Sequence, residues 1–193
     1  MARHRTLSSI IVLSLALSLP AAAAGDSAQS FVRERQSELS TLVKSNESKK
    51  IESVFDSILD YDALAQGSLR DHWATRSDAE KKEFQDVLKQ LVQRTYRKNL
   101  DRTLGYDVRF DGESKNSEAF VVRTIAQNKR NAREEPIAID YVVHRVGDTW
   151  RIRDIVTEGS SLVGNYNQQF NRIIKKDGFT ELMKKMRNKL GTG

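Results

Sequence analysis

Few side chains in this sequence have the chemistry of a catalytic or metal site. The chain has 193 residues, no cysteine and three histidines, which are His4, His72 and His144. Without cysteine there is no thiolate nucleophile, no thiolate metal ligand and no disulfide. His72 stands beside a tryptophan and His144 lies near a predicted hairpin, and neither imposes a carboxylate–histidine–serine order. We therefore interpret these histidines as surface or structural residues.

Carboxylate pairs and phosphate-binding motifs give no stronger case for an enzyme. Asp60 and Asp62 are two residues apart, so on a helix they point in different directions, and they are better suited to capping it. Asp154 and Glu158 belong to one strand and its exit. A phosphate loop, a dinucleotide glycine pattern and a serine-elbow motif are all missing from the sequence. We predict a protein without catalytic activity, metal or cofactor.

The first 24 residues have the features of a secretory signal peptide. Arg3 and Arg5 give a positive start, residues 7–19 form an apolar run, and small residues end the segment at Ala24. A helix of that run would be about 20 Å long, which is too short for a bilayer core of about 30 Å. We predict cleavage near Ala24, export, and a single mature domain over residues 25–193.

The charge of the chain is mildly positive and evenly distributed. There are 32 basic and 26 acidic residues, which gives a formal net charge of +6. The basic residues are scattered among acidic ones instead of forming a dense patch, so we predict no nucleic-acid partner. The charge favours anionic surfaces instead, including phospholipid headgroups.

Helical periodicity dominates the first half of the mature chain and returns at its end. Apolar residues recur at helical spacing over residues 31–43, 51–59 and 61–69. The strongest helix, over 78–102, begins at Ser77-Asp78-Ala79-Glu80, which has the form of a capping box. Two more helices are predicted over 162–174 and 179–190, with a break at Gly178.

Between these helical segments the period of the pattern changes to two. Strands are predicted over residues 106–110, 119–125, 137–144 and 150–157, with turn signals at Asp111-Gly112 and Gly147-Asp148. In the last strand, Trp150, Ile152 and Val156 are predicted to share a face. The sequence thus predicts an α+β domain in which N-terminal and C-terminal helices cover an antiparallel sheet of about four strands. Periodicity alone leaves open whether its interior is a filled core or a lined cavity.

One motif is specific enough to suggest a family. Residues 150–166, WRIRDIVTEGSSLVGNY, resemble the MlaC proteins, the periplasmic phospholipid-binding proteins of the Mla pathway, also known as toluene-tolerance auxiliary components of an ABC transporter. That family carries a Trp-led strand, then a Val-Glu-Gly-Val-Ser-Leu-Val segment and Asn-Tyr-Arg. The matches here are Asp154-Ile155, Glu158-Gly159, Ser161-Leu162-Val163, Asn165-Tyr166 and Gln169-Phe170, and further matches are Tyr61-Asp62, Ala65, Gly67, His72-Trp73, Phe84, Tyr96, Gly178-Phe179 and Leu182. The resemblance covers nearly all of the mature chain.

Four positions depart from the family pattern. Arg153 stands where the family usually has Tyr, Thr157 and Ser160 replace common valines, and Asn167 replaces a common Arg. The first three alter the corner between strand and helix. The fourth removes a charge that would otherwise be available to a headgroup or a partner.

The resemblance implies a periplasmic lipid carrier without catalytic activity. Such proteins carry phospholipid between an outer-membrane MlaA-type lipoprotein complex and an inner-membrane MlaD-type ABC transporter complex, which maintains outer-membrane lipid asymmetry. The implied fold is a twisted antiparallel sheet whose helices enclose an apolar cavity for acyl chains, in a monomer that leaves the headgroup outside. Three alternatives remain: a carrier of another membrane lipid of the hopanoid type, an envelope adaptor with a filled core, and a lipid hydrolase.

The predicted lipid-binding wall consists of the apolar and tyrosine side chains that the periodicity directs inward. For each of them, ordinary core packing is the alternative. Arg97, Arg151 and Arg153 are further candidates for contact with a phosphate or an acidic partner, with solvated surface as the alternative. The wall residues are Leu88, Leu91, Val92 and Tyr96 in the long helix, Val122, Ile139, Tyr141, Val143, Ile152 and Val156 in the sheet, and Leu162, Val163, Tyr166 and Phe170 in the helix that follows.

Overall fold

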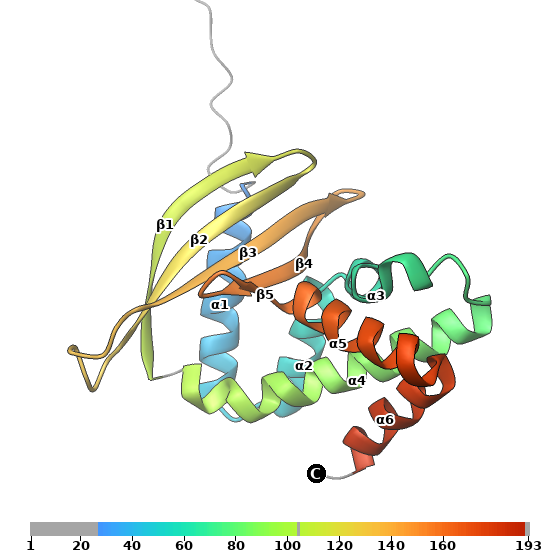
Figure 1. Ribbon diagram of the computed structural model, residues 1–193. Coiled ribbons are helices and arrows are strands. Elements are labelled where there is room, and N and C mark those ends of the chain that lie inside the picture. The colour runs from blue at the N-terminus through green and yellow to red at the C-terminus, as the bar shows by residue number, and fades with distance from the viewer. Residues whose placement is uncertain (1–26, 104, 192–193) are drawn as a thin grey trace, which may run out of the picture.

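The computed structural model describes residues 27–103 and 105–191, and within residues 97–103 it describes only the backbone (Figure 1). The predicted signal peptide with its cleavage near Ala24, and the side chain of Arg97, lie outside the described residues. In the part of the chain that is described, no helix is both long enough and apolar enough to cross a membrane.

The order of elements confirms the predicted α+β class, with helices before and after an antiparallel sheet. The sheet has five strands instead of about four, because a two-residue strand follows the four that were predicted. The elements are α1 (Ala28–Lys44), α2 (Ser48–Ile58), α3 (Tyr61–Leu69), the 3₁₀ turn η1 (Arg70–His72), α4 (Asp78–Thr103), β1 (Tyr106–Asn116), β2 (Ala119–Asn128), β3 (Ile137–Val146), β4 (Thr149–Thr157), β5 (Ser160–Ser161), α5 (Leu162–Asp177) and α6 (Phe179–Gly191).

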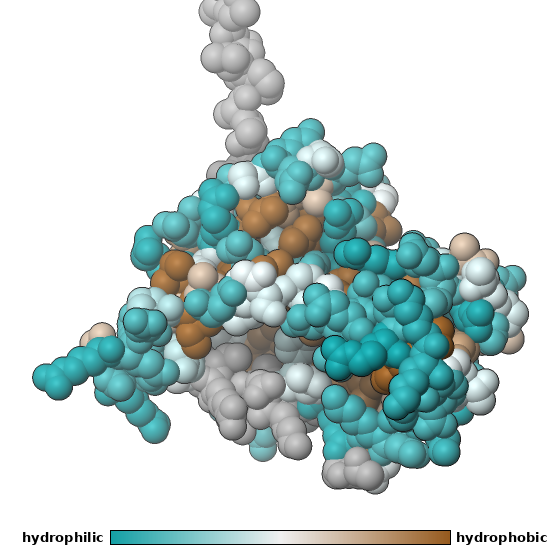
Figure 2. Space-filling model, in the orientation of Figure 1, coloured by the Kyte–Doolittle hydropathy of each residue, from teal (hydrophilic) through white to brown (hydrophobic). Residues whose placement is uncertain are grey.

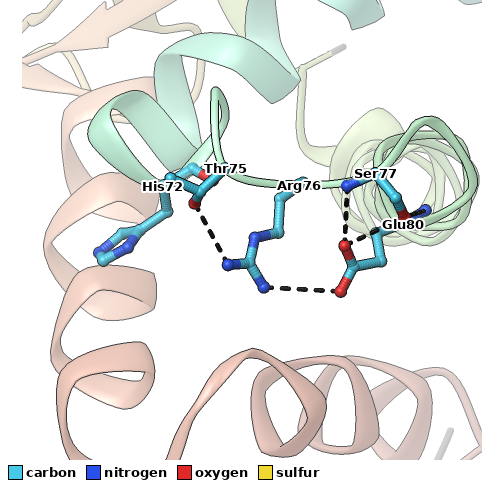
Figure 3. A network of polar contacts seen from close by, with 5 residues as sticks. All are labelled: His72, Thr75, Arg76, Ser77 and Glu80. Carbon is cyan, nitrogen blue, oxygen red and sulfur yellow. Dashed lines mark hydrogen bonds and ion pairs between the residues drawn. The ribbon is translucent and has the colours of Figure 1, made fainter.

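Several helices begin where side chains satisfy their free backbone N–H groups. The Asp60 carboxylate accepts from the N–H of Ala63 at 2.8 Å, which confirms its predicted role as a cap of α3. At the start of α4 the N–H of Glu80 donates to the Ser77 hydroxyl oxygen at 3.2 Å, and the N–H of Ser77 donates to the Glu80 carboxylate at 2.8 Å (Figure 3). This reciprocal pair is the predicted capping box.

The loop before α4 also holds α6 in place through Arg76. Its guanidinium contacts the Glu80 carboxylate at 3.5 Å and the Thr75 hydroxyl at 3.2 Å (Figure 3). The same guanidinium lies 4.9 Å from the centre of the Phe179 ring, at the first residue of α6. The beginnings of α4 and α6 are therefore joined by one arginine.

The strands follow one another in space in the order β1-β2-β3-β4-β5, and every neighbouring pair is antiparallel. The predicted turn at Asp111-Gly112 is wrong, because β1 continues to Asn116. The two residues instead form an irregularity in the pairing between Phe110 and Glu113, and the positive φ of Gly112 accommodates it.

A second irregularity, in β4, changes the sheet face to which the residues after it point. Val143 pairs with Ile152, but Val142 pairs with Asp154, so Arg153 is an extra residue on its strand. Since paired residues point to the same side of a sheet, Ile155 shares the face of its partner Tyr141, which also carries Ile152. Val156 pairs with Asp140 and lies on the opposite face, which corrects the predicted alternation.

The helices cover the sheet face that carries Val122, Val143 and Ile152, which we call the inner face. These three side chains are buried in one core together with residues of α1 to α6. The helix α1 contacts β1, β2 and β3, while α2, α3 and α5 contact β4 (Figure 1). At its centre the helical layer is tightly filled: the rings of Phe84 and Phe170 pack edge to face at 5.6 Å.

Candidate functional site

The fourteen predicted wall residues divide into two groups by burial. Seven are fully buried members of the core, with less than one tenth of their surface exposed. They come from α4, from three strands and from α5, and they fill space between these elements. The seven are Leu88, Leu91, Val92, Val122, Val143, Ile152 and Phe170.

The other seven residues keep accessible surface. Val156 does so on the outer face of the sheet, but the remaining six come from the three elements that face one another inside the molecule. On the molecular surface in view in Figure 2, hydrophobic residues gather over the sheet, whereas the region of α5 and α6 is mostly hydrophilic. The six are Tyr96, Ile139, Tyr141, Leu162, Val163 and Tyr166.

Three tyrosines stand out among these six because each comes from a different element. Tyr96 of α4 stacks on Phe55 of α2, with ring centres 4.8 Å apart. Tyr166 of α5 stacks on Phe170 at 5.2 Å. Tyr141 of β3 lies on the inner face opposite Ile155. A long helix, the closing helix and the sheet thus each contribute one phenol.

The electrostatics of the phenols indicate that they lie near one another in a buried region. Burial is the largest cause that raises the pKa of Tyr96, and the neighbouring phenols of Tyr141, Tyr166 and Tyr61 contribute after it, followed by the Asp154 carboxylate. Burial alone raises the pKa of Tyr141 to about 12, and burial also raises the pKa of Tyr166. These phenols are therefore shielded from bulk water although their side chains keep accessible surface. Partial exposure combined with a buried phenol is typical of a side chain that lines an interior space.

The corner between β4 and α5 positions the last part of this wall. The Asp154 carboxylate accepts from the Ser161 hydroxyl at 2.6 Å and from the N–H of Val163 at 3.1 Å. The Ser161 hydroxyl oxygen in turn accepts from the N–H of Gly164 at 2.8 Å and caps α5. These contacts fix the start of α5, and Leu162, Val163 and Tyr166 with it. The motif that suggested a family thus fixes the direction of α5 relative to the sheet.

Most of the polar side chains considered for catalysis or for contact with a phosphate instead connect elements of the fold. The His144 ring contacts the Asp60 carboxylate at 2.8 Å, and this links β3 to the cap of α3. The His72 ring contacts Asn171 of α5 at 2.9 Å. Arg151 donates to the carbonyl oxygens of Asp56 and Ser57 at the end of α2. Arg153 is exposed at the bulge. Among the side chains that the structure describes, no three His, Asp or Glu residues are grouped as a metal site would require.

The structure adds residues of the sheet and of α2 that were absent from the predicted wall. Ile155 enters because of the bulge, which nothing in the alternating pattern revealed. Phe55 enters through its stacking on Tyr96, and its place in the apolar stripe of α2 was the available signal. Phe110, Phe120 and Trp150 also pack against the core from the sheet, and Phe120 contacts Trp150 edge to face at 5.4 Å.

The wall side chains that these elements contribute keep accessible surface although their phenols are shielded from bulk water, and a lining of this kind suits a hydrocarbon ligand. The sequence model of the MlaC protein family matches residues 25–188. The chain belongs to the MlaC family. This confirms the resemblance seen at the strand-to-helix motif.

Comparison with solved structures supports the fold of this MlaC-family chain. A phospholipid-binding protein from Ralstonia solanacearum, solved in complex with a phospholipid, superposes with a TM-score of 0.73. The two sequences are 23% identical, and the match covers 86% of this chain and 99% of the other. No curated protein matches the sequence.

Proposed function

We propose that this MlaC-family protein is a periplasmic phospholipid carrier that holds acyl chains between the inner face of the sheet and helices α2, α4 and α5. The observation that carries the proposal is the apolar wall whose side chains are shielded from bulk water yet incompletely covered, with Tyr96, Tyr141 and Tyr166 as its clearest members. The bound phospholipid in the structurally similar Ralstonia solanacearum protein supports it.

The physical need for such a carrier follows from the cost of exposing acyl chains. Two chains hold roughly thirty methylenes, and at about 0.8 kcal/mol each their transfer into water costs on the order of 20 kcal/mol. A carrier must offset this cost with its own apolar surface. The inner-face residues of β2, β3 and β4 and the facing sides of α4 and α5 provide that surface.

The route of transport belongs to the same proposal. Lipid would pass between an outer-membrane MlaA-type complex and an inner-membrane MlaD-type ABC transporter, with the protein acting as a monomer and maintaining lipid asymmetry. Binding and release need no bond chemistry, only a partner that binds the open or emptied state better.

The test of the proposal is extraction of the purified protein. The full chain is produced in a Gram-negative host, recovered after export, and extracted with organic solvent for mass spectrometry. We expect diacyl phospholipid near one molecule per protein. Hopanoid in place of phospholipid would reassign the cargo, and no lipid after gentle purification would favour an adaptor with a filled core. Release of fatty acid from added phospholipid would indicate a hydrolase.

Two adjacent residues provide a matched control for the location of the lipid. Ile155 lies on the inner face and Val156 on the outer face. Ile155→Glu places a carboxylate against hydrocarbon and is expected to reduce the bound lipid at least tenfold, because a charge there excludes acyl chains. Val156→Glu adds the same charge outside and is expected to retain lipid. Equal retention by both folded variants would place the lipid elsewhere.

A further inference from the structure

The hydroxyl groups of Tyr96, Tyr141 and Tyr166 are the polar atoms of the inner wall that lack a hydrogen-bond partner. In the part of the chain that the structure describes, none of the three makes a hydrogen bond. Tyr61 differs, since its hydroxyl contacts the Asp56 carboxylate at 3.3 Å. Tyr106 also differs, with Glu134 at 3.4 Å. Shielded hydroxyls without partners are costly, so this set calls for an explanation.

These hydroxyls are also not completely covered by other protein atoms. Among the described residues, the side-chain nitrogen and oxygen atoms that are both fully covered and unpartnered belong to Arg35, Ser68 and Arg76. The phenol oxygens of Tyr96, Tyr141 and Tyr166 are not among these atoms, so each borders some accessible space. Since burial raises the pKa of Tyr96, Tyr141 and Tyr166, that space is shielded from bulk water, and the phenols remain protonated donors at physiological pH.

Three donors set in an otherwise apolar wall fit a ligand with a narrow band of acceptors beside hydrocarbon. A diacyl lipid has such a band, because its two ester carbonyl oxygens accept hydrogen bonds and lie directly above the acyl chains. We propose that the hydroxyls of Tyr96, Tyr141 and Tyr166 donate hydrogen bonds to the ester carbonyl oxygens of the bound lipid. This inference rests on the proposed function and adds that the ester linkage, as well as the chains, enters the protein.

The arrangement gives the carrier a fixed depth of insertion. One phenol comes from α4, one from β3 and one from α5, so the carbonyls are met from three sides of the interior. Stacking on Phe55 and Phe170 holds the rings of Tyr96 and Tyr166 in place. Because the headgroup takes no part in these bonds, the tyrosines select for ester-linked lipids irrespective of the headgroup.

The test is a competition between an ester-linked and an ether-linked lipid that share chains and headgroup. Delipidated protein is incubated with vesicles that contain equal amounts of dipalmitoyl phosphatidylcholine and its dihexadecyl ether analogue, and the lipids bound are measured by mass spectrometry. We expect the natural protein to prefer the ester by about three- to tenfold for each hydrogen bond made. Tyr96→Phe, Tyr141→Phe and Tyr166→Phe should each reduce the preference, and the triple variant should bind both lipids equally. Tyr106→Phe is the matched control and should retain the preference.

The outcomes separate this inference from the proposed function. Equal binding of both lipids by the natural protein, or a preference that survives in the triple variant, would overturn the carbonyl contact and leave the carrier proposal standing. Loss of both lipids alike in the folded Phe variants would also overturn it, because the hydroxyls would then bind the phosphate. Binding of neither lipid by the natural protein would overturn both proposals. Any single Tyr→Phe variant that fails to fold is replaced in the comparison by the other two.

Discussion

The helical layer and the accessible wall residues of α4, β3 and α5, which we call the lining, are built from similar residues but packed differently. In the helical layer Phe84, Leu64 and Leu182 keep at most 2% of their surface exposed. On the wall, Tyr141 and Ile139 lie on an inner face of the same domain and still keep accessible surface. The difference teaches that an inward-facing apolar side chain is either part of a filled core or part of a lining, and that its neighbours decide which.

The backbone explains this difference between the two regions. In the helical layer Gly67 lets α3 and α5 approach closely, because a Cβ there would lie 2.6 Å from Cγ1 of Val163. In the sheet, irregular pairing near Gly112 and at Arg153 bends β1 and β4 instead. The two regions therefore differ in their backbones: the helices approach closely at Gly67, whereas β1 and β4 bend at their irregular pairs.

The largest expected effect comes from placing a carboxylate in each region. Leu91→Asp buries a charge in the filled core, and we expect it to lower the free energy of unfolding by more than about 4 kcal/mol, enough to unfold much of the protein. Ile139→Asp places the same group on the lining, where the side chain is only partly covered and the carboxylate keeps some accessible surface, and should cost less than about 2 kcal/mol. Urea denaturation followed by circular dichroism measures both.

The same pair of variants can also contradict the comparison. If Ile139→Asp destabilises the protein as much as Leu91→Asp, the lining is a filled core after all. Leu91→Met is the control, since a swap that keeps volume and apolarity should cost less than about 1.5 kcal/mol. Bound lipid in the folded Ile139→Asp protein, measured on the same samples, should fall even though stability is nearly kept.

The sequence predicted the helix caps well because their signal is local, although the equally local turn signal at Asp111-Gly112 marked a bulge instead of a turn. The capping box at Ser77 and Glu80 and the cap at Asp60 are contacts between residues three apart, and both are present in the structure. The extra residue at Arg153 is not a local property, because pairing with β3 creates it, and one inserted residue moved Val156 to the outer face. The division of the predicted wall into buried and accessible residues could not be predicted from the sequence either. Periodicity gives the direction of a side chain but not which residues lie opposite it.

A smaller effect is expected from titrating the lining at high pH. Burial raises the pKa of Tyr141 from an ordinary value near 10 to about 12. The phenol therefore binds its proton more tightly in the folded protein. The stability linked to it is complete below pH 10 and is lost as the pH rises from about 10 to about 12, by about 3 kcal/mol.

Urea denaturation at several pH values between 9 and 12 measures this loss, together with phenolate absorbance of the folded protein. Tyr141→Phe should remove the share of one phenol from the pH dependence of stability, since Tyr96 and Tyr166 also have raised pKa values, while Tyr106→Phe should leave it unchanged. A Tyr141 that ionises near pH 10 in the folded protein would mean that the space beside it is open to bulk water. That result would remove the contrast between a shielded lining and ordinary surface.

The smallest expected effect comes from a substitution in the closely packed helical layer. Gly67→Ala adds one methyl group where Val163 leaves no room, so α3 and α5 must separate or Val163 must leave its rotamer, at a cost of about 1–3 kcal/mol. Gly191→Ala adds the same methyl group near the end of α6, where no atom lies within 4 Å, and should be neutral or slightly stabilising. Thermal denaturation of the two variants measures the difference. Because Val163 also belongs to the lining, Gly67→Ala should reduce lipid retention in proportion to the shift of α5, whereas equal stability of the two variants would show that the contact between α3 and α5 yields easily.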